Sequence, residues 1–207
     1  MNTTAPPESA AGELYQQAID TLRRLLEEAA AAGDPEPTAM NLATFDAGGR
    51  VHSRVVLLKG LGHDGLRFFT NYESAKATQL AAHAQAALTF HWKTLRDQVQ
   101  VRVEGLVEKL GAADSDAYFA SRPRLSQIGA WASLQSQELP GREVFDARVA
   151  EIEKRFDGID VPRPPHWGGY LLVPDLFEFW YGAKFRLHER QRYQFTDGEW
   201  RKRQLYP

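Results

Sequence analysis

The chain has 207 residues, of which 43% are hydrophobic and 11% aromatic, so it can bury a substantial core. Its 25 basic and 27 acidic residues give a formal net charge of −2, which provides no overall attraction to nucleic acid or to an anionic membrane. There is no cysteine, which excludes disulfides, thiolate metal sites and a cysteine nucleophile and leaves the redox compartment undetermined.

Residues 1–12 are rich in Pro, Thr, Ser and Ala, which predicts a flexible N-terminal tail. They carry neither a basic start nor an apolar stretch, and no apolar run in the chain approaches membrane-spanning length. We therefore expect no secretion signal, no membrane contact and a cytoplasmic location. A leucine- and alanine-rich segment from Leu14 to about Ala32 then predicts one helix, which ends at Gly33.

After the breaker stretch GDPEPT, short runs of β-formers predict five strands, in the order MNLATF, VHSRVVLLKGL, LRFFTNY, AALTFHW and QVQVRVEGLVEKL. The stretches DAGG and GHDG predict turns. Most of these strands are too close for crossover helices, which favours an antiparallel barrel over a parallel sheet. A short helix is expected within SAKATQLAAHA.

Two further helices are expected from Asp114 to Ser121 and from Arg142 to Phe156, both packed on the barrel. A proline-rich connector, VPRPPHW, leads to the predicted strands GGYLLVP, LFEFWYG, RQRYQF and EWRKRQLY. The last two are joined at Thr196, Asp197 and Gly198, a good hairpin turn. Because these strands return after a helical excursion, we expect them to complete the same sheet. The prediction is one domain over residues 13–207, mainly β with helices (α+β).

The clearest chemical pattern lies in YFASRPRLSQIGAWASLQS, residues 118–136. Tyr118, Arg122 and Ser126 recur every four residues, with no carboxylate among the three. Tyr118 and Arg122 share a helical face, and Pro123 limits how far that helix continues. The pattern suits a small dianion such as phosphate. The alternative is a helix end whose Tyr and Arg face solvent.

A second group of donors points to another phosphate site. Arg54 and Lys59 flank VVLL on a predicted strand. Ser74 and Lys76 fall where a helix should begin, and free backbone amides at a helix start attract anions. The alternatives are a strand-end lysine in water and an ordinary N-cap serine. Only the accumulation of these residues favours function.

In KFRLHERQR, Arg186, His188 and Arg190 alternate, so an extended segment would project all three to one side. Such a face suits an anionic or electron-rich ligand, and His188 could carry a proton. The alternative is an edge strand charged to prevent pairing. Trp180 could wall a flat aromatic ligand, or be plain core.

Several common site motifs are absent from the sequence. The six histidines show no HExxH spacing, and no metal site is predicted. There is no GxSxG elbow, no GK[ST] loop and no GxGxxG turn. A nucleotide or flavin would therefore bind without a Rossmann turn.

Eight segments in order, RVVLLK, TNYESAK, QVRVEG, YFASRPRLSQIGAW, LQS, WGGY, FEFW and RLHER, resemble the pyridoxamine 5'-phosphate oxidase family. The match runs from about Met40 to Pro207. The resemblance implies an FMN-binding split β-barrel, a Greek-key antiparallel barrel with peripheral helices, and a homodimer with FMN in clefts between subunits. It further implies oxidation of pyridoxamine 5'-phosphate and pyridoxine 5'-phosphate to pyridoxal 5'-phosphate, in vitamin B6 biosynthesis and salvage. Oxygen would accept the electrons, with release of H2O2 and, from the amine, ammonia.

The resemblance also assigns roles to matching positions. The implied FMN contacts are Arg54, Val55, Val56, Leu57, Leu58, Lys59, Phe69, Thr70, Lys76, Gln100, Gln135, Ser136, Trp180 and Arg190. The implied substrate contacts are Lys59, Tyr118, Arg122 and Ser126 around the phosphate, and Arg186, Leu187 and His188 over the pyridine ring. Arg186 and His188 are the candidate catalytic residues.

The chain departs from the family pattern in three places. Ala75 stands where the family commonly has an arginine on the FMN phosphate, which predicts weaker FMN binding. The stretch LRDQVQVRVEG is two residues longer than the pattern, so Gln98 or Gln100 could be the flavin contact; the spacing onward to Tyr118 favours Gln100. A basic and aromatic lid segment present in some members has no counterpart in residues 1–12.

Three rival functions stay open on sequence alone. One is a split-barrel flavin oxidoreductase with another substrate, and the second is a protein that holds FMN or pyridoxal phosphate without turnover. The third is a nucleic-acid-binding barrel. It is supported only by Trp200, Arg201, Lys202, Arg203 and Tyr206.

Overall fold

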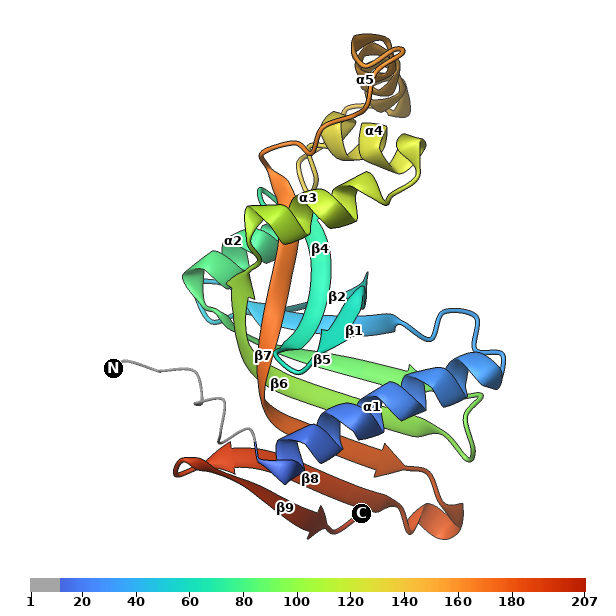
Figure 1. The fold of residues 1–207 in the computed structure, drawn as a ribbon, viewed down its shortest axis with the longest axis vertical. Helices are drawn as coiled ribbons and strands as arrows, with labels where there is room; N and C mark the ends of the chain where they lie inside the picture. The colour runs from blue at the N-terminus through green and yellow to red at the C-terminus, as the bar shows by residue number, and fades with distance from the viewer. Residues whose placement is uncertain (1–11) are drawn as a thin grey trace.

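The computed structural model describes residues 12–207, so the predicted tail lies almost wholly outside the described residues. The helices are α1 (Glu13–Ala31), α2 (Ala75–Ala82), α3 (Ala112–Ala120), α4 (Arg124–Ala132), α5 (Arg142–Arg155) and the short 3₁₀ turn η1 (Lys184–Arg186). The strands are β1 (Ala39–Phe45), β2 (Val51–Leu57), β3 (Gly60–Gly62), β4 (Gly65–Asn71), β5 (Gln85–Trp92), β6 (Val99–Lys109), β7 (Trp167–Tyr181), β8 (Glu189–Thr196) and β9 (Glu199–Leu205). Figure 1 shows how they are arranged.

The first helix forms because its apolar residues recur at helical spacing and bury one face. Ile19, Leu22 and Leu25 are completely buried; each such side chain stabilises the fold by roughly 1.5 to 3 kcal/mol. The helix ends at Ala31, and Gly33, two residues beyond it, has a φ of 77° in the left-handed region. The predicted helix and its stop are confirmed, and Figure 1 shows α1 lying across the sheet.

The nine strands form one sheet in which every pairing is antiparallel, as predicted. The order is β2-β1-β5-β6-β7-β4-β3, with β8 paired to β7 and β9 paired to β8. The late strands therefore complete the same sheet as the early ones. The hairpin turn is also confirmed, since Asp197 and Gly198 have φ of 56° and 83°.

The central strand β7 corrects the prediction of two separate strands, GGYLLVP and LFEFWYG. It runs unbroken for 15 residues and pairs with β6, β4 and β8. Pro174, which has no N–H to donate, lies opposite Gly105 where the register with β6 shifts. Such a bulge tolerates proline and bends the strand. The long strand thus curls the sheet into a half-barrel (Figure 1).

The helices α3, α4 and α5 form a second, smaller unit of packing. Its core is Phe119, Ile128, Ala130, Phe156, Val161 and Trp167. The helix α3 lies against β7, but α5 packs on α4 away from the sheet (Figure 1). The expectation that both predicted helices pack on the barrel is therefore wrong for α5, which has no fully buried residue of its own.

Two local features of the chain differ from the sequence prediction. Pro123 not only limits the helix before it but also immediately precedes α4, a helix start that tolerates a residue without an N–H. The segment KFRLHERQR is not extended throughout, because η1 occupies its start, with Phe185 and Arg186 at φ of 58° and 62°. The expected alternation of Arg186 with His188 therefore does not hold.

Candidate active site

The first group of site residues gathers at the start of α2, and we call it the α2 cluster: Thr70, Ser74, Lys76, Gln135 and Ser136. Lys76 Nζ donates to Gln135 Oε1 at 2.7 Å, to Thr70 Oγ1 at 3.1 Å and to Ser74 Oγ at 3.2 Å. Thr70 Oγ1 in turn donates to Gln135 Oε1 at 3.1 Å. Residues from β4, α2 and the segment after α4 therefore converge, although up to 65 positions separate them in sequence.

Lys76 carries an electrostatic signature of an anion site. Burial lowers its pKa to about 8, and the positive charge of Arg54 adds to the shift. Within residues 12–207, its hydrogen-bond partners are all neutral oxygens. A half-buried ammonium without a carboxylate is stabilised by any anion that reaches it.

Arg54, whose charge acts on Lys76, is held in place by two side-chain hydrogen bonds. Its guanidinium donates to Thr44 Oγ1 at 2.5 Å and to Gln79 Oε1 at 2.9 Å, and burial lowers its pKa. Both acceptors are neutral, so the positive charge is oriented but not cancelled. Thr44 and Gln79 were not identified from sequence, and no motif marks them.

The N-terminus of α2 faces the same place. Ala75 N donates to Ser136 Oγ at 3.2 Å, and Ser136 has a φ of 74°. Ser74 occupies the N-cap position, but its hydroxyl donates to Asn71 O at 2.8 Å and does not cap the helix. The ordinary N-cap interpretation of Ser74 is therefore wrong, and its hydroxyl oxygen accepts from Lys76 instead.

A second group, the Trp167 cluster, consists of Phe69, Tyr118, Arg122 and Trp167. The Tyr118 ring stacks on Phe69 with 3.9 Å between centroids, and the Arg122 guanidinium lies 4.7 Å from the Trp167 centroid. Nη1 of Arg122 is buried and has no hydrogen-bond partner in the described part of the chain. Burial lowers the pKa of Arg122, although Tyr118 opposes this shift. The guanidinium is packed on Trp167 and one of its nitrogens is buried, so the solvent-facing alternative for Arg122 is wrong.

The other two predicted phosphate ligands have simpler surroundings. Ser126 is half-buried in the first turn of α4, beyond Pro123. Lys59 has an exposed side chain just after β2, and its backbone N–H donates to Arg67 O at 2.8 Å. Lys59 thus matches the strand-end alternative in this chain taken alone.

The third group, the Trp180 cluster, lies at the opposite end of β7 and comprises Gln100, Trp180, His188 and Arg190. Trp180 is paired in register with Gln100 on β6 and with Arg190 on β8, and cross-strand partners share a face of the sheet. The rings of Trp180 and His188 lie 4.5 Å apart. Three predicted flavin contacts are thereby aligned in one row.

The ligand-facing chemistry of His188 is restricted by one backbone contact. Ala183 N donates to His188 Nδ1 at 3.1 Å, so the neutral ring carries its proton on Nε2. Arg186 and Leu187, next to it in sequence, are exposed. The edge-strand alternative for this region is wrong, because β8 has partners on both sides.

The choice between Gln98 and Gln100 stays a prediction. Gln98 precedes β6 with a φ of 88°, and its Oε1 lies 3.2 Å from His91 Nε2. Gln100 lies in the row with Trp180 and Arg190. The row is the structural argument for Gln100.

The α2 and Trp180 clusters are separated along β7. Thr70 lies opposite Gly168 at the start of the strand, whereas Trp180 is near its end. Gly168 and Trp180 are twelve positions apart, which corresponds to roughly 40 Å of strand, less where the sheet curls. Figure 1 shows the start of β7 beside α2 and its end beside β8.

The strand β2 offers backbone groups rather than side chains. It pairs with β1 alone among the described strands, so its other edge is not used by a neighbour in the sheet. Val55 is 67% exposed on this strand. The predicted contacts from Val55 to Leu58 therefore belong to a sheet edge and the residue that follows it.

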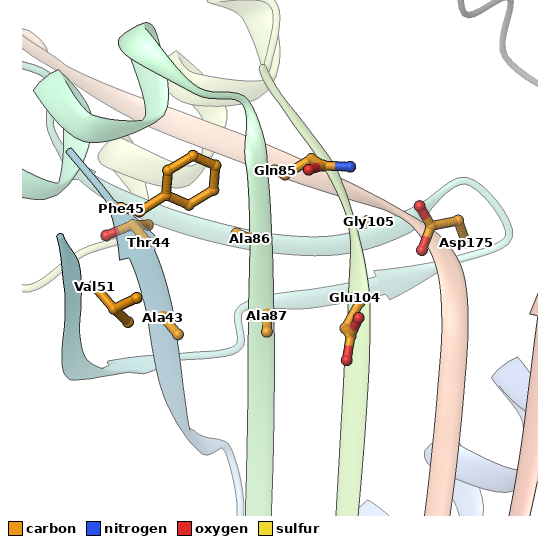
Figure 2. Close-up of a pocket in the computed structure, with 10 residues that line it drawn as sticks. All are labelled: Ala43, Thr44, Phe45, Val51, Gln85, Ala86, Ala87, Glu104, Gly105 and Asp175. Atoms are coloured by element: carbon orange, nitrogen blue, oxygen red, sulfur yellow. The ribbon is translucent and has the colours of Figure 1, made fainter. Parts of the chain in front are cut away.

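A cavity of about 240 Å³ elsewhere on the sheet contains none of the predicted site residues (Figure 2). Its charged groups are the carboxylates of Glu104 and Asp175, and burial together with Glu104 raises the pKa of Asp175. Two carboxylates repel a phosphate. This cavity is therefore not part of the candidate site.

Two family models, curated proteins and solved structures are similar to this chain. A family model described as pyridoxamine 5'-phosphate oxidase matches residues 26–156, and one described as pyridoxine 5'-phosphate oxidase C-terminal dimerisation region matches residues 167–207. A curated pyridoxine/pyridoxamine 5'-phosphate oxidase of Xanthomonas euvesicatoria pv. vesicatoria (strain 85-10) is 53% identical, over 94% of this chain and 99% of that protein.

Two solved structures share the fold. PhzG from Burkholderia lata 383, in complex with tetrahydrophenazine-1-carboxylic acid, has a TM-score of 0.86 and 33% identity, covering 91% of this chain and 92% of that one. A pyridoxamine 5'-phosphate oxidase-related, FMN binding protein from Nostoc punctiforme PCC 73102 has a TM-score of 0.66 and 17% identity, covering 97% and 100%. The second likeness shows the fold alone.

The curled sheet with its peripheral helices is thus a split β-barrel, as predicted. The chain belongs to the pyridoxamine 5'-phosphate oxidase family, whose members are oxidoreductases. Among residues 12–207, no helix is long and apolar enough to cross a membrane.

Proposed function

We propose that the protein oxidises pyridoxamine 5'-phosphate and pyridoxine 5'-phosphate to pyridoxal 5'-phosphate, with FMN as cofactor and O2 as electron acceptor. H2O2 would be released, with ammonia from the amine substrate. The observation that carries this proposal is Nη1 of Arg122, which is buried beside Tyr118 and without a partner in residues 12–207. A phosphate monoester supplies the missing acceptor.

The residues of the α2 cluster fit the phosphate of FMN. Lys76 and Arg54 supply positive charge, while Thr70, Gln135 and Ser136 supply polar groups around it. Phe69 and the sheet edge from Val55 to Leu58 would border the flavin. When bound, FMN supplies the redox chemistry by accepting a hydride from the substrate carbon that bears the amine or hydroxyl.

The Trp167 cluster would hold the substrate phosphate. Arg122 and Tyr118 would donate to it, with Ser126 and Lys59 as further donors. Anchoring the phosphate fixes the rest of a small rigid ring in one orientation, which lowers the entropy cost of reaction. Binding energy far from the reacting carbon thereby contributes to rate.

Arg186, Leu187 and His188 would cover the pyridine ring. Arg186 is exposed and carries its charge on a turn with positive φ. His188 can donate from Nε2, because Nδ1 is occupied by the Ala183 N–H. We propose that Arg186 and His188 orient the substrate and assist proton movement.

A homodimer would bring the separated clusters together, with FMN in the clefts between subunits. The α2 cluster and the Trp180 cluster lie at opposite ends of β7, so one flavin would take its phosphate ligands from one copy and the contacts of the Trp180 cluster from the other. The match of residues 167–207 to a dimerisation region supports this arrangement. Sedimentation of the purified protein tests it, and a fully active monomer would refute it.

The relative at 53% identity bears the name of this activity, which supports it over the alternatives. PhzG is related at 33% identity and was solved with a molecule that is not a vitamin B6 phosphate. Oxidation of another substrate on the same barrel is therefore the second candidate. The buried Nη1 of Arg122, which has no hydrogen-bond partner in residues 12–207, supports the first.

The deciding experiment adds pyridoxine 5'-phosphate to the FMN-loaded protein without oxygen. We expect the yellow flavin absorbance to bleach and to return in air, with equal amounts of pyridoxal 5'-phosphate and H2O2. Pyridoxine without phosphate is the matched control and should bleach far more slowly. A protein that binds FMN but never bleaches would be a binder or an enzyme for another substrate. A protein with no affinity for flavin would leave the nucleic-acid alternative.

A further inference from the structure

We propose that Glu178 is a positioning residue for the flavin ring: its carboxylate fixes the guanidinium of Arg190 beside Trp180. The inference rests on the proposed function, because it takes Arg190 as a flavin contact. It adds a residue that no motif assigned to the site. Glu178 lies within FEFW, where sequence alone marks only Trp180.

The geometry around Glu178 is that of a clamp on Arg190. Oε1 of Glu178 accepts from both Nε and Nη2 of Arg190, at 3.0 and 2.6 Å. Nη1 of Arg190 donates to Tyr206 O at 3.0 Å. Three of the five N–H groups of the guanidinium are thereby used within residues 12–207, and two would be available to a ligand.

The register of the sheet explains why Glu178 reaches Arg190. Glu178 and Trp180 are two positions apart on β7 and so project from the same face. Arg190 is the cross-strand partner of Trp180, which makes it the diagonal neighbour of Glu178. Long side chains bridge such diagonals. Without this contact, the guanidinium of Arg190 would no longer be held in one position beside Trp180.

The burial of Glu178 shows that this contact is more than a surface ion pair. Its side chain is 5% exposed, and two other arginines, Arg102 and Arg192, lie 3.3 and 3.2 Å from Oε2. Burial alone raises the pKa of this carboxyl, but the hydrogen bonds from Arg190 and Arg192 and the charge of Arg102 outweigh it and lower the pKa. The group is thus a carboxylate at neutral pH.

The two carboxylate oxygens of Glu178 have different partners. Oε1 serves Arg190, while Oε2 faces Arg102 and Arg192. One oxygen therefore offsets the repulsion of the flanking arginines and the other orients the ring contact. Replacing the carboxylate by an amide would leave three guanidinium groups close together, one of them free to rotate away from Trp180.

A double-mutant cycle on the full-length protein tests the proposal, with FMN and riboflavin titrated separately into the apoprotein. We expect Glu178→Gln and Arg190→Gln each to weaken both flavins about tenfold, because both act at the ring. In the Arg190→Gln background, Glu178→Gln should cause no further loss, since its target is gone. Unchanged affinity in Glu178→Gln, or full additivity of the two losses, would overturn the role of Glu178.

Two controls separate positioning from folding. Glu104→Gln removes a carboxylate that pairs with Arg102 at 2.9 Å but does not touch Arg190, so flavin affinity should not change. If Glu178→Gln fails to fold, Arg192→Gln combined with Glu178→Gln removes one of the opposed cations. This double variant should fold, and it should bind both flavins about tenfold more weakly than Arg192→Gln alone. Equal affinity in the double variant and in Arg192→Gln would contradict the proposal.

The same cycle distinguishes failure of the inference from failure of the proposed site. If Arg190→Gln binds FMN and riboflavin as tightly as the unaltered protein does, Arg190 is not a flavin contact. The proposed role of Arg190 and the positioning role of Glu178 are then both wrong. If Arg190→Gln weakens the flavins and Glu178→Gln does not, only the positioning role of Glu178 falls.

Discussion

The α2 cluster and the Trp180 cluster differ in how completely one chain builds them. In the α2 cluster, three separate elements meet and their side chains bond to one another around the half-buried Lys76. In the Trp180 cluster, the residues form a row on one face of the sheet, next to a turn whose Phe185 is 89% exposed. The polar side chains of the α2 cluster therefore bond to one another, whereas the Trp180 cluster is one face of the sheet with no opposing element in residues 12–207.

This difference separates two kinds of recognition. A phosphate needs a few charged donors held at short range, which a helix start and two nearby segments can supply within one chain. A flat ring needs walls on both sides, and one sheet face provides only one of them. The α2 cluster is therefore expected to select for phosphate, and the Trp180 cluster to depend on assembly.

The largest expected effect is at the substrate phosphate. Arg122→Met keeps much of the side-chain volume over Trp167 but removes the charge. Two charge-assisted hydrogen bonds would be lost, roughly 3 to 6 kcal/mol, so kcat/KM for pyridoxine 5'-phosphate should fall at least about a hundredfold. FMN affinity, measured by titration, should stay the same. Unchanged kcat/KM would remove Arg122 from the site.

The next effect concerns the catalytic turn. Arg186→Ala should lower turnover about a hundredfold, which is typical for a group that assists proton movement or orients a reactant. FMN occupancy should change far less, because Arg186 is not among the proposed flavin contacts. Steady-state kinetics beside the flavin content of the purified variant give both values. Turnover equal to the unaltered protein would contradict the assignment.

A matched pair of variants tests the two ends directly. Lys76→Met removes a cation at the FMN phosphate and should weaken FMN roughly thirtyfold while weakening riboflavin little. Trp180→Leu removes a ring contact and should weaken both flavins alike, by roughly tenfold. Kd values for both ligands and both variants are needed. If the loss of FMN affinity relative to the loss of riboflavin affinity were the same in both variants, the two clusters would not differ in the part of FMN that they bind.

Ala75 gives a prediction in the opposite direction. Ala75 is exposed at the start of α2, close to Ser136, and the resemblance to the family implies an arginine at this position. Ala75→Arg should tighten FMN about tenfold or more, since a hydrogen bond to a charged group is worth roughly 1.5 to 3 kcal/mol. Ala75→Gln is the uncharged control. An unchanged FMN titration would sink the idea.

The smallest effect is a pH dependence of FMN affinity. The pKa of Lys76 is lowered to about 8 by burial, with Arg54 adding to it, so above that pH the free protein must take up a proton to bind the phosphate. Kd for FMN should rise with pH, by at most about tenfold per unit, between about pH 8 and the higher pKa of the complex. Lys76→Arg should remove this dependence.

The stability of the apoprotein should respond to pH with the opposite sign. The unfolded chain keeps Lys76 protonated up to its ordinary pKa of about 10.5, whereas the folded chain releases the proton from about pH 8. The unfolded state thus binds more protons in this window, and the contribution of Lys76 to stability rises with pH. Denaturant unfolding of the protein and of Lys76→Arg measures it.

Much of the fold follows from local pattern. The helix from Leu14 ends at Gly33 because a left-handed residue there satisfies the last carbonyls, and the Asp197 and Gly198 step closes β8 on β9. The strands were recognisable because alternation and β-branched residues recur between turn residues. The chemistry at Tyr118, Arg122 and Lys76 was visible from spacing and residue type.

Other features depend on contacts between distant segments. Pro174 ends a strand in the sequence prediction, but in the structure it pairs with Gly105 beside a bulge within one long strand. The turn at Arg186 has a positive φ that no local rule predicts for arginine. Glu178 has Arg102 and Arg192 as its cross-strand neighbours because of the register of β6, β7 and β8, which the sequence does not reveal.

The sequence by itself therefore determined most of the secondary structure, the family and the identity of the charged donors, because these depend on residue type and short spacing. Tertiary structure alone decided which donors are paired. Lys76 finds only neutral partners and Arg122 has an open Nη1 in residues 12–207, whereas Arg190 is clamped by a buried carboxylate. Pairing depends on long-range register and burial, which set the cost of an unsatisfied charge.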